Sequence, residues 1–196
     1  MQKPQEEKTL VLIKPDGVKR GLTGEIIKRI EQRGLKVIAM KMFWATPKDL
    51  KKHYSDSESN LRAMGEKTLA AYQKYGLDAE KEIGTADEVK IGKMVHGWIA
   101  DFMISGPIVK MVVQGVHAVE MVRKLVGHTI PSMAEMGTIR GDFSVDSAVL
   151  ANTQKRGIRN IVHASGNIAE AEQEIALWFT PEEIHEYKRA EEDIMF

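Results

Sequence analysis

Apolar and polar positions near the amino end follow two different periods. Thr9 to Ile13 is a short run of β-branched residues and leucine, typical of a buried strand, and Pro15-Asp16-Gly17 then predicts a turn. Gly24 to Arg33 places its isoleucines on one helical face, and Leu35 to Phe43 alternates apolar and polar residues as a half-buried strand does. This stretch therefore predicts a strand, a helix and a second strand.

Capping signals mark the helices in the middle of the chain. Thr46-Pro47 combines an N-cap residue with a proline at the first helical position, which predicts a helix that continues to Tyr54. From Ser55 to Met103 the sequence is charged and helical in its spacing, and capping boxes begin at Ser55 and at Thr85. We expect two or three additional helices in this segment.

The rest of the chain repeats the order of strand and helix. The pattern predicts a strand from Ile108 to Gln114, a helix that ends before Gly127, a short strand at Ile161-Val162, a helix that ends at Trp178 and a capped helix that begins at Thr180. The order β-α-β-β-α-β predicts an α+β fold in which helices cover one face of a four-stranded antiparallel sheet, the ferredoxin-like arrangement. The length of 196 residues suits a single domain over residues 1–196.

Composition excludes several classes of protein and site. The 28 Lys and Arg residues balance 28 Asp and Glu residues, so no overall field draws the chain to nucleic acid or to an anionic membrane. The absence of cysteine excludes disulfides and thiolate metal sites. The longest apolar stretches, such as Ile108 to Val113, fall far short of the roughly 20 residues that span a bilayer, and the first residues lack a signal-peptide core. We therefore expect a cytoplasmic protein that binds neither membrane nor nucleic acid.

The most informative segment is Arg159 to Ser165, which presents one histidine among residue types that bind phosphate. His163 alone could be a satisfied structural residue, as a histidine in an apolar strand usually is. However, Asn160 and Ser165 supply hydrogen-bonding groups, and Glu174 on the next helix could fix the tautomer and orientation of the ring. The segment points to phosphoryl transfer through a phosphohistidine.

Three cationic residues could complete an anion site. Lys14 stands at the end of a buried strand, where its ammonium suits a phosphate oxygen or a sugar hydroxyl, although it could equally belong to a polar strand-to-turn connection. Arg140 lies in the glycine-containing segment Gly137 to Asp142, and Arg123 shortly precedes another glycine. Either arginine could instead be a solvated surface charge. Together the three cations would neutralise a polyphosphate.

Three segments together resemble the nucleoside diphosphate kinase family. The signature segments of that family are matched, in the same order, by Thr9 to Val18, Gly137 to Phe143 and Asn160 to Ser165. The resemblance covers nearly the whole chain, and three co-occurring motifs are highly specific. It implies a phosphotransferase with ping-pong kinetics, which moves the γ-phosphoryl group of a nucleoside triphosphate such as ATP to a nucleoside diphosphate.

The resemblance also implies a role for each matching residue. His163 would be the nucleophile, Lys14 would contact phosphate and ribose, and Asn160 would contact the ribose. The phosphate chain would be held by Arg123, Thr129 and Arg140, while Tyr54 would pack near His163, and Ser165 with Glu174 would support its ring. Mg²⁺ is implied as a cofactor that arrives with the nucleotide rather than in a protein cage. A homo-oligomer, commonly a hexamer built from dimers, is implied as the assembly.

Two stretches are longer than in compact members of the family, a feature that we associate with archaeal-type members. They are insertions at about residues 56–103 and 144–157. The family's aromatic base-stacking position falls near Val95, so the base could stack on Val95, on Trp98 or on neither. Ala164 and Gly166 replace commoner residues near the histidine, and we expect the reaction to tolerate both changes.

Two other functions compete with this interpretation. A single-stranded RNA-binding module has the same β-α-β-β-α-β order, but it needs aromatic residues on its third strand, and Ile108 to Gln114 has none. A family member that has lost catalysis would survive as a scaffold, but His163, Lys14 and Arg140 are all present. The other histidines show no metal-ligand spacing, so we assign no metal to them.

Overall fold

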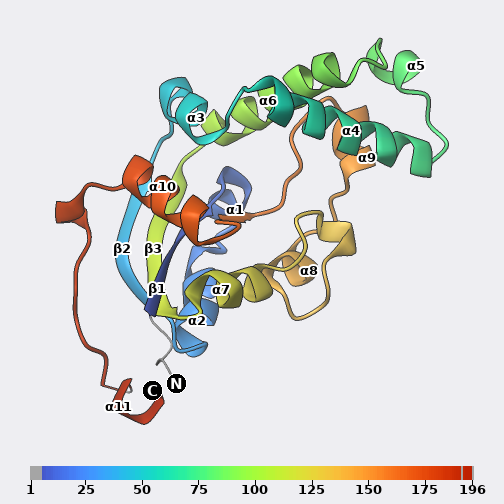
Figure 1. The fold of residues 1–196 in the computed structure, drawn as a ribbon. Helices are drawn as coiled ribbons and strands as arrows, with labels where there is room; N and C mark the ends of the chain where they lie inside the picture. The colour runs from blue at the N-terminus through green and yellow to red at the C-terminus, as the bar shows by residue number, and fades with distance from the viewer. Residues whose placement is uncertain (1–5, 191, 196) are drawn as a thin grey trace, which may run out of the picture.

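A four-stranded antiparallel sheet forms the centre of the computed structural model, which describes residues 6–190 and 192–195 (Figure 1). The strands are β1 (Glu6–Ile13), β2 (Lys36–Phe43), β3 (Ile108–Val116) and β4 (Val162–Ala164), in the spatial order β2-β3-β1-β4. Each pair of neighbouring strands is antiparallel. The predicted α+β, ferredoxin-like fold is confirmed.

Helices connect and surround these strands. Within the described residues they are α1 (Pro15–Lys19), α2 (Thr23–Gln32), α3 (Pro47–His53), α4 (Glu58–Lys74), α5 (Ala79–Ile83), α6 (Glu88–Ile104), α7 (Ala118–Val126), α8 (Ile139–Phe143), α9 (Ala148–Thr153), α10 (Ile168–Trp178) and α11 (Glu192–Met195), with 3-10 turns η1 (Pro131–Met133) and η2 (Pro181–Glu183). Among the described residues, none of these helices combines the length and the apolar character that a membrane crossing requires.

Both faces of the sheet are covered, which corrects the expectation that helices cover one face. Successive residues of a strand point to opposite faces, so β1 contributes to two cores. Val11 and Ile13 pack in one core with Ile26 of α2. Leu10 and Leu12 pack in the other with side chains from three helices, namely Leu50 of α3, Met103 of α6 and Trp178 of α10. The second layer forms because α3, α6 and α10 each present apolar residues to the sheet.

The first predicted turn is wrong, because Pro15-Asp16-Gly17 begins helix α1. Proline at the first helical position has its φ already set for a helix. The negative carboxylate of Asp16 in the first turn interacts favourably with the partial positive charge at the N-terminus of the helix. The turn residues therefore act as a helix start, directly after Lys14.

Helix starts elsewhere differ from the predicted capping boxes. The N-cap of α4 is Ser57 rather than Ser55, and the N-cap of α6 is Asp87 rather than Thr85; each side chain accepts the backbone N–H three residues on. Thr180 does form a capping box, but the segment after it makes only the 3-10 turn η2 instead of a helix. The signals locate the helices to within about a turn, because neighbouring Ser, Thr and Asp residues compete for the same capping role.

The segment predicted as the first insertion folds into α4, α5 and α6, and α4 lies along α6 (Figure 1). The two long helices meet at glycines. A Cβ atom at Gly65 would lie 1.9 Å from the carbonyl oxygen of Glu88, and one at Gly92 would lie 1.9 Å from that of Leu61. Helix α9, from the segment predicted as the second insertion, also contacts α4.

Candidate active site

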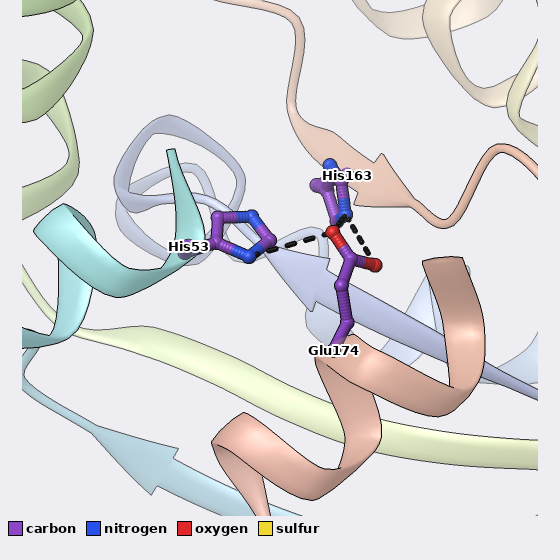
Figure 2. Close-up of side chains that lie close together, drawn as sticks. All are labelled: His53, His163 and Glu174. Atoms are coloured by element: carbon purple, nitrogen blue, oxygen red, sulfur yellow. Dashed lines mark hydrogen bonds and ion pairs between the residues drawn. The ribbon is translucent and has the colours of Figure 1, made fainter. Parts of the chain in front are cut away.

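His163 lies on β4, where it pairs with Leu12 of β1, and its imidazole is held from behind by Glu174 of α10 (Figure 2). Nε2 of His163 is 2.8 Å from Oε1 and 3.0 Å from Oε2 of Glu174. Because a carboxylate only accepts hydrogen bonds, Nε2 must carry the proton. The lone pair of the neutral ring therefore lies on Nδ1.

The carboxylate of Glu174 is itself held in place. Ser165 donates from Oγ to Oε2 at 2.6 Å, and the same hydroxyl accepts the backbone N–H of Leu10 in β1 at 3.2 Å. Burial alone would raise the pKa of Glu174, but the hydrogen bonds from His163 and Ser165 outweigh it, so the net shift is downward. Glu174 thus remains a carboxylate that can fix the tautomer of His163.

A second histidine, His53 at the end of α3, completes this cluster. Its Nδ1 lies 3.4 Å from Oε1 of Glu174, and its ring meets that of His163 edge to face, with centroids 4.7 Å apart (Figure 2). Burial, followed by the nearby His163, lowers the pKa of His53 to about 3, so its ring is neutral. The ligand atoms of His53, His163 and Glu174 lie within 4.8 Å of one another, as a metal site would require. However, Nδ1 of the neutral His53 ring already accepts the indole N–H of Trp178 at 3.2 Å, so it makes no hydrogen bond to Glu174 and is not free to bind a metal. His53 therefore packs against the hydrogen-bonded pair of His163 and Glu174.

Lys14 follows β1 directly and reaches the segment that precedes β4. Its Nζ donates to Oδ1 of Asn160 at 2.8 Å, and Nδ2 of Asn160 donates to the carbonyl of Thr129 at 2.9 Å. Burial and then the charge of Arg140 lower the pKa of Lys14 to about 8. A buried ammonium with two further donors is therefore held beside the histidine strand.

Arg140 is buried and joins the segment around Ile161 to Gly127 through three carbonyls. Its guanidinium donates to the carbonyls of Asn160 at 3.1 Å, Gly127 at 2.8 Å and Val162 at 2.6 Å. Burial and then Arg123 lower its pKa to about 10, which leaves it charged at neutral pH. Since a guanidinium has five N–H groups, two remain for an anion. The guanidinium of Arg123 makes no hydrogen bond or ion pair within the part of the chain that the structure describes, so all of it is available.

The backbone just before β4 is strained. Ile161 has φ of 70°, a conformation that a β-branched residue rarely adopts and that costs about 1–3 kcal/mol. Its N–H donates to Asp16 at 3.0 Å and its carbonyl accepts from the backbone N–H of Lys14 at 2.7 Å. A Cβ atom on Gly17 would lie only 3.0 Å from the Ile161 carbonyl oxygen. The Lys14 to Gly17 motif thus supports the bend that turns Asn160 and His163 toward the same side.

A cavity of about 890 Å³ brings the predicted residues together. It is lined by His163 and by all seven residues expected to contact substrate, which are Lys14, Tyr54, Val95, Arg123, Thr129, Arg140 and Asn160. His163 is 17% exposed, so its ring is accessible from the cavity. Ser165 and Glu174 are buried behind the ring, as their supporting role requires. Trp98 does not line the cavity and packs instead with the core around Tyr72.

Some contributions to the site were missed from the sequence. His53 stood next to Tyr54 at the end of the predicted helix, but nothing in its spacing linked it to Glu174. Tyr54 lines the cavity and packs edge to face on His53, with centroids 4.6 Å apart, and burial raises the pKa of its hydroxyl. Helices α4 and α9 also line the cavity, and nothing in the sequence of either helix indicated this.

Comparisons with known proteins identify the family of the chain. The family model described as nucleoside diphosphate kinase matches residues 7–65 and 69–184. A nucleoside diphosphate kinase from Pyrobaculum aerophilum is 51% identical over 180 residues, which cover 92% of this chain and 98% of the relative, and one from Archaeoglobus fulgidus is 38% identical over 190 residues, 97% of each chain.

Solved structures give the same result. The crystal structure of an NDP kinase from Pyrobaculum aerophilum has a TM-score of 0.89 at 48% identity and covers 93% of this chain and all of its own. A transition state mimic of the nucleoside-diphosphate kinase of Borrelia burgdorferi, with bound vanadate and ADP, has a TM-score of 0.76 at 37% identity and covers 95% of each chain.

Proposed function

The chain belongs to the nucleoside diphosphate kinase family, and from this premise we propose that Nδ1 of His163 is the atom that carries the phosphoryl group. The chain is a phosphotransferase that moves the γ-phosphoryl group of a nucleoside triphosphate to a nucleoside diphosphate. The observation that supports the assignment is the position of Glu174, which occupies Nε2 and leaves the Nδ1 lone pair on a ring that lines the cavity.

In the first half-reaction, Nδ1 of His163 attacks the γ-phosphorus and forms a P–N bond while the bond to the bridging oxygen breaks and the diphosphate leaves. No proton has to leave Nδ1, because the attacking nitrogen is already unprotonated. Positive charge develops on the ring, and the carboxylate of Glu174 stabilises it through the Nε2–H. In the second half-reaction a bound diphosphate attacks phosphorus by the reverse path.

The cations of the cavity bind the phosphate chain in this mechanism. Lys14 and Arg140 each keep free N–H groups, and Arg123 has its whole guanidinium available. The hydroxyl of Thr129 and the amide of Asn160 provide neutral partners for phosphate and ribose. These contacts do not involve the base, so we expect transfer to diphosphates of all common bases.

Magnesium fits this site only as an ion that the nucleotide carries. Among the described residues, no Asp or Glu lines the cavity, so the protein offers no carboxylate cage. When bound to the phosphates, Mg²⁺ would neutralise part of their charge. Lys14, Arg123 and Arg140 would neutralise the rest.

We also propose a homo-oligomer, with a hexamer favoured. Strand β2 is at the edge of the sheet, and Met40 and Met42 on it are 57% and 63% exposed. Met133 and Met136, in the segment after α7, are exposed as well. Apolar side chains on an open edge strand and on a loop suit contacts between subunits. Light scattering that gives a monomeric mass would contradict this assembly.

The nucleophile is tested by labelling. The protein is incubated with γ-labelled ATP, freed of nucleotide and examined for a label that acid removes, as expected of a phosphohistidine. His163→Ala should carry no label, whereas His128→Gln, which alters another histidine that lines the cavity, should retain it. A label that persists in His163→Ala would place the nucleophile elsewhere.

A further inference from the structure

Part of the cavity wall is built by the helices α4, α6 and α9. The chain after α9 is pressed against α6, because a Cβ atom on Gly157 would lie 3.2 Å from the carbonyl oxygen of Trp98 and 3.4 Å from Cα of Ile99. Three residues later comes Asn160, which binds Lys14. The segment after α9 thus packs against α6 and leads directly to Asn160 and Lys14 at the site expected to bind phosphate.

Asn152 on α9 is the feature of this wall that the mechanism does not use. It lines the cavity and is 5% exposed, yet its carboxamide makes no hydrogen bond to any residue that the structure describes. Asn160, in contrast, has both ends of its carboxamide bonded within the protein and keeps one N–H for the nucleotide. The amide atoms of Asn152 are not among the fully enclosed polar atoms of the described residues, so they are open to the cavity and free to hydrogen-bond a ligand.

Other polar groups around α9 have their partners inside the protein. Ser147 caps the helix by accepting the N–H of Leu150, and the hydroxyl of Thr153 bonds to backbone carbonyls. Arg156 makes a two-point ion pair with Asp146, at 2.6 and 2.9 Å. The free carboxamide of Asn152 is therefore not part of a generally polar, solvated helix face.

The cavity that Asn152 lines has apolar surface that suits a nucleobase. Asn152 carries no charge, and Val95, Ile99 and Ile158 give the same cavity apolar surface for a flat ring. The phosphates already have Lys14, Arg123 and Arg140. We propose that the carboxamide of Asn152 hydrogen-bonds the polar edge of the nucleobase, an inference that rests on the proposed function. Because the amide can present its donor and its acceptor in either order by a half-turn, it can serve every common base.

The second half-reaction tests this proposal. Phosphoenzyme is prepared with saturating ATP and freed of nucleotide, and the rate of its dephosphorylation is measured with ADP, GDP, CDP, UDP and the base-free ribose 5-diphosphate. Asn152→Leu keeps the size and packing of the side chain but removes its hydrogen bonds. We expect the apparent second-order rate constant to fall by about tenfold for the four nucleotides and to stay unchanged for ribose 5-diphosphate.

A matched control is Asn60→Leu, an exposed asparagine at the start of α4, which should leave all five rates unchanged. Equal losses for the base-free and base-carrying acceptors in Asn152→Leu would overturn the proposal in favour of a structural role. Unchanged rates for all acceptors would overturn it as well. Failure of the wild-type protein to form any phosphoenzyme would instead refute the proposed function.

Discussion

Replacing Glu174 with Gln tests how the nucleophile is prepared. The carboxylate accepts from Nε2 of His163 and from Oγ of Ser165, so its hydrogen bonds to both residues require it to be an acceptor. Glutamine has nearly the same shape, but one of its two terminal atoms donates. If the amide NH₂ faces Nε2, the ring proton moves to Nδ1 and the attacking lone pair is lost; if it faces Ser165, the charge that stabilises the phosphorylated ring is lost.

The size of the effect follows from the contacts. A hydrogen bond to a charged group contributes about 1.5–3 kcal/mol, and Glu174 lies in a buried position where solvent screens it little. Because the stabilisation grows as the ring acquires charge, most of this energy should appear in the transition state. We expect phosphorylation by ATP to slow by roughly 10- to 100-fold.

Rapid-quench measurement of labelled phosphoenzyme at saturating ATP gives the rate of the chemical step. Glu172→Gln is the matched control, since Glu172 is an exposed residue of the same helix and should leave the rate unchanged. A rate for Glu174→Gln within twofold of wild type would refute the view that this carboxylate fixes the tautomer and stabilises the charged ring.

Three further predictions concern stability. The pKa of Lys14 is about 8 in the folded protein and 10.5 in the unfolded chain, so the unfolded state binds more protons between these pH values. The free energy of unfolding of wild type, measured by urea denaturation, should therefore rise relative to that of Lys14→Met from about pH 8 to 10.5. A difference between the two proteins that stays constant across this pH range would contradict the prediction. Gly17→Ala should destabilise the protein by about 1–3 kcal/mol, because the new Cβ would lie 2.8 Å from Cγ2 of Ile13. Gly24→Ala is the control, since a Cβ there meets open space and should be neutral or stabilise by up to about 1 kcal/mol. Equal urea midpoints for the two variants would count against the close contact at Gly17. Arg140→Lys should lower the thermal midpoint, since an ammonium cannot reach three carbonyls at once, and a midpoint equal to wild type would show that these bonds contribute nothing.

The strands and the histidine were predictable because their signals are local. Buried strands such as β1 and β3 contain mainly apolar runs, and their ends were located to within about three residues. The placement of Lys14 at the end of β1 followed from the same run. The family resemblance carried by three motifs then implied the set of residues that the cavity brings together.

The missed features depend on contacts between distant segments. The partnership of His53 with Glu174 joins α3 to α10, and no spacing within either helix encodes it. The second helical layer could not be inferred from the order β-α-β-β-α-β, because its helices α3, α6 and α10 are additions to that order. A proline alone does not distinguish a turn from the start of a helix. Pro15 is compatible with both, and the packing of Gly17 against Ile161, which accompanies the helix, is a contact between segments distant in sequence.

The bond from Lys14 to Asn160 spans 146 positions in the chain, and that from Leu10 to Ser165 spans 155. Contacts so remote in sequence form late in folding, because closing such long loops is entropically unfavourable until most of the structure exists. Competence to accept a phosphoryl group should therefore be among the last properties that a refolding or newly synthesised chain acquires. Labelled ATP could thus serve as a reporter of completed folding.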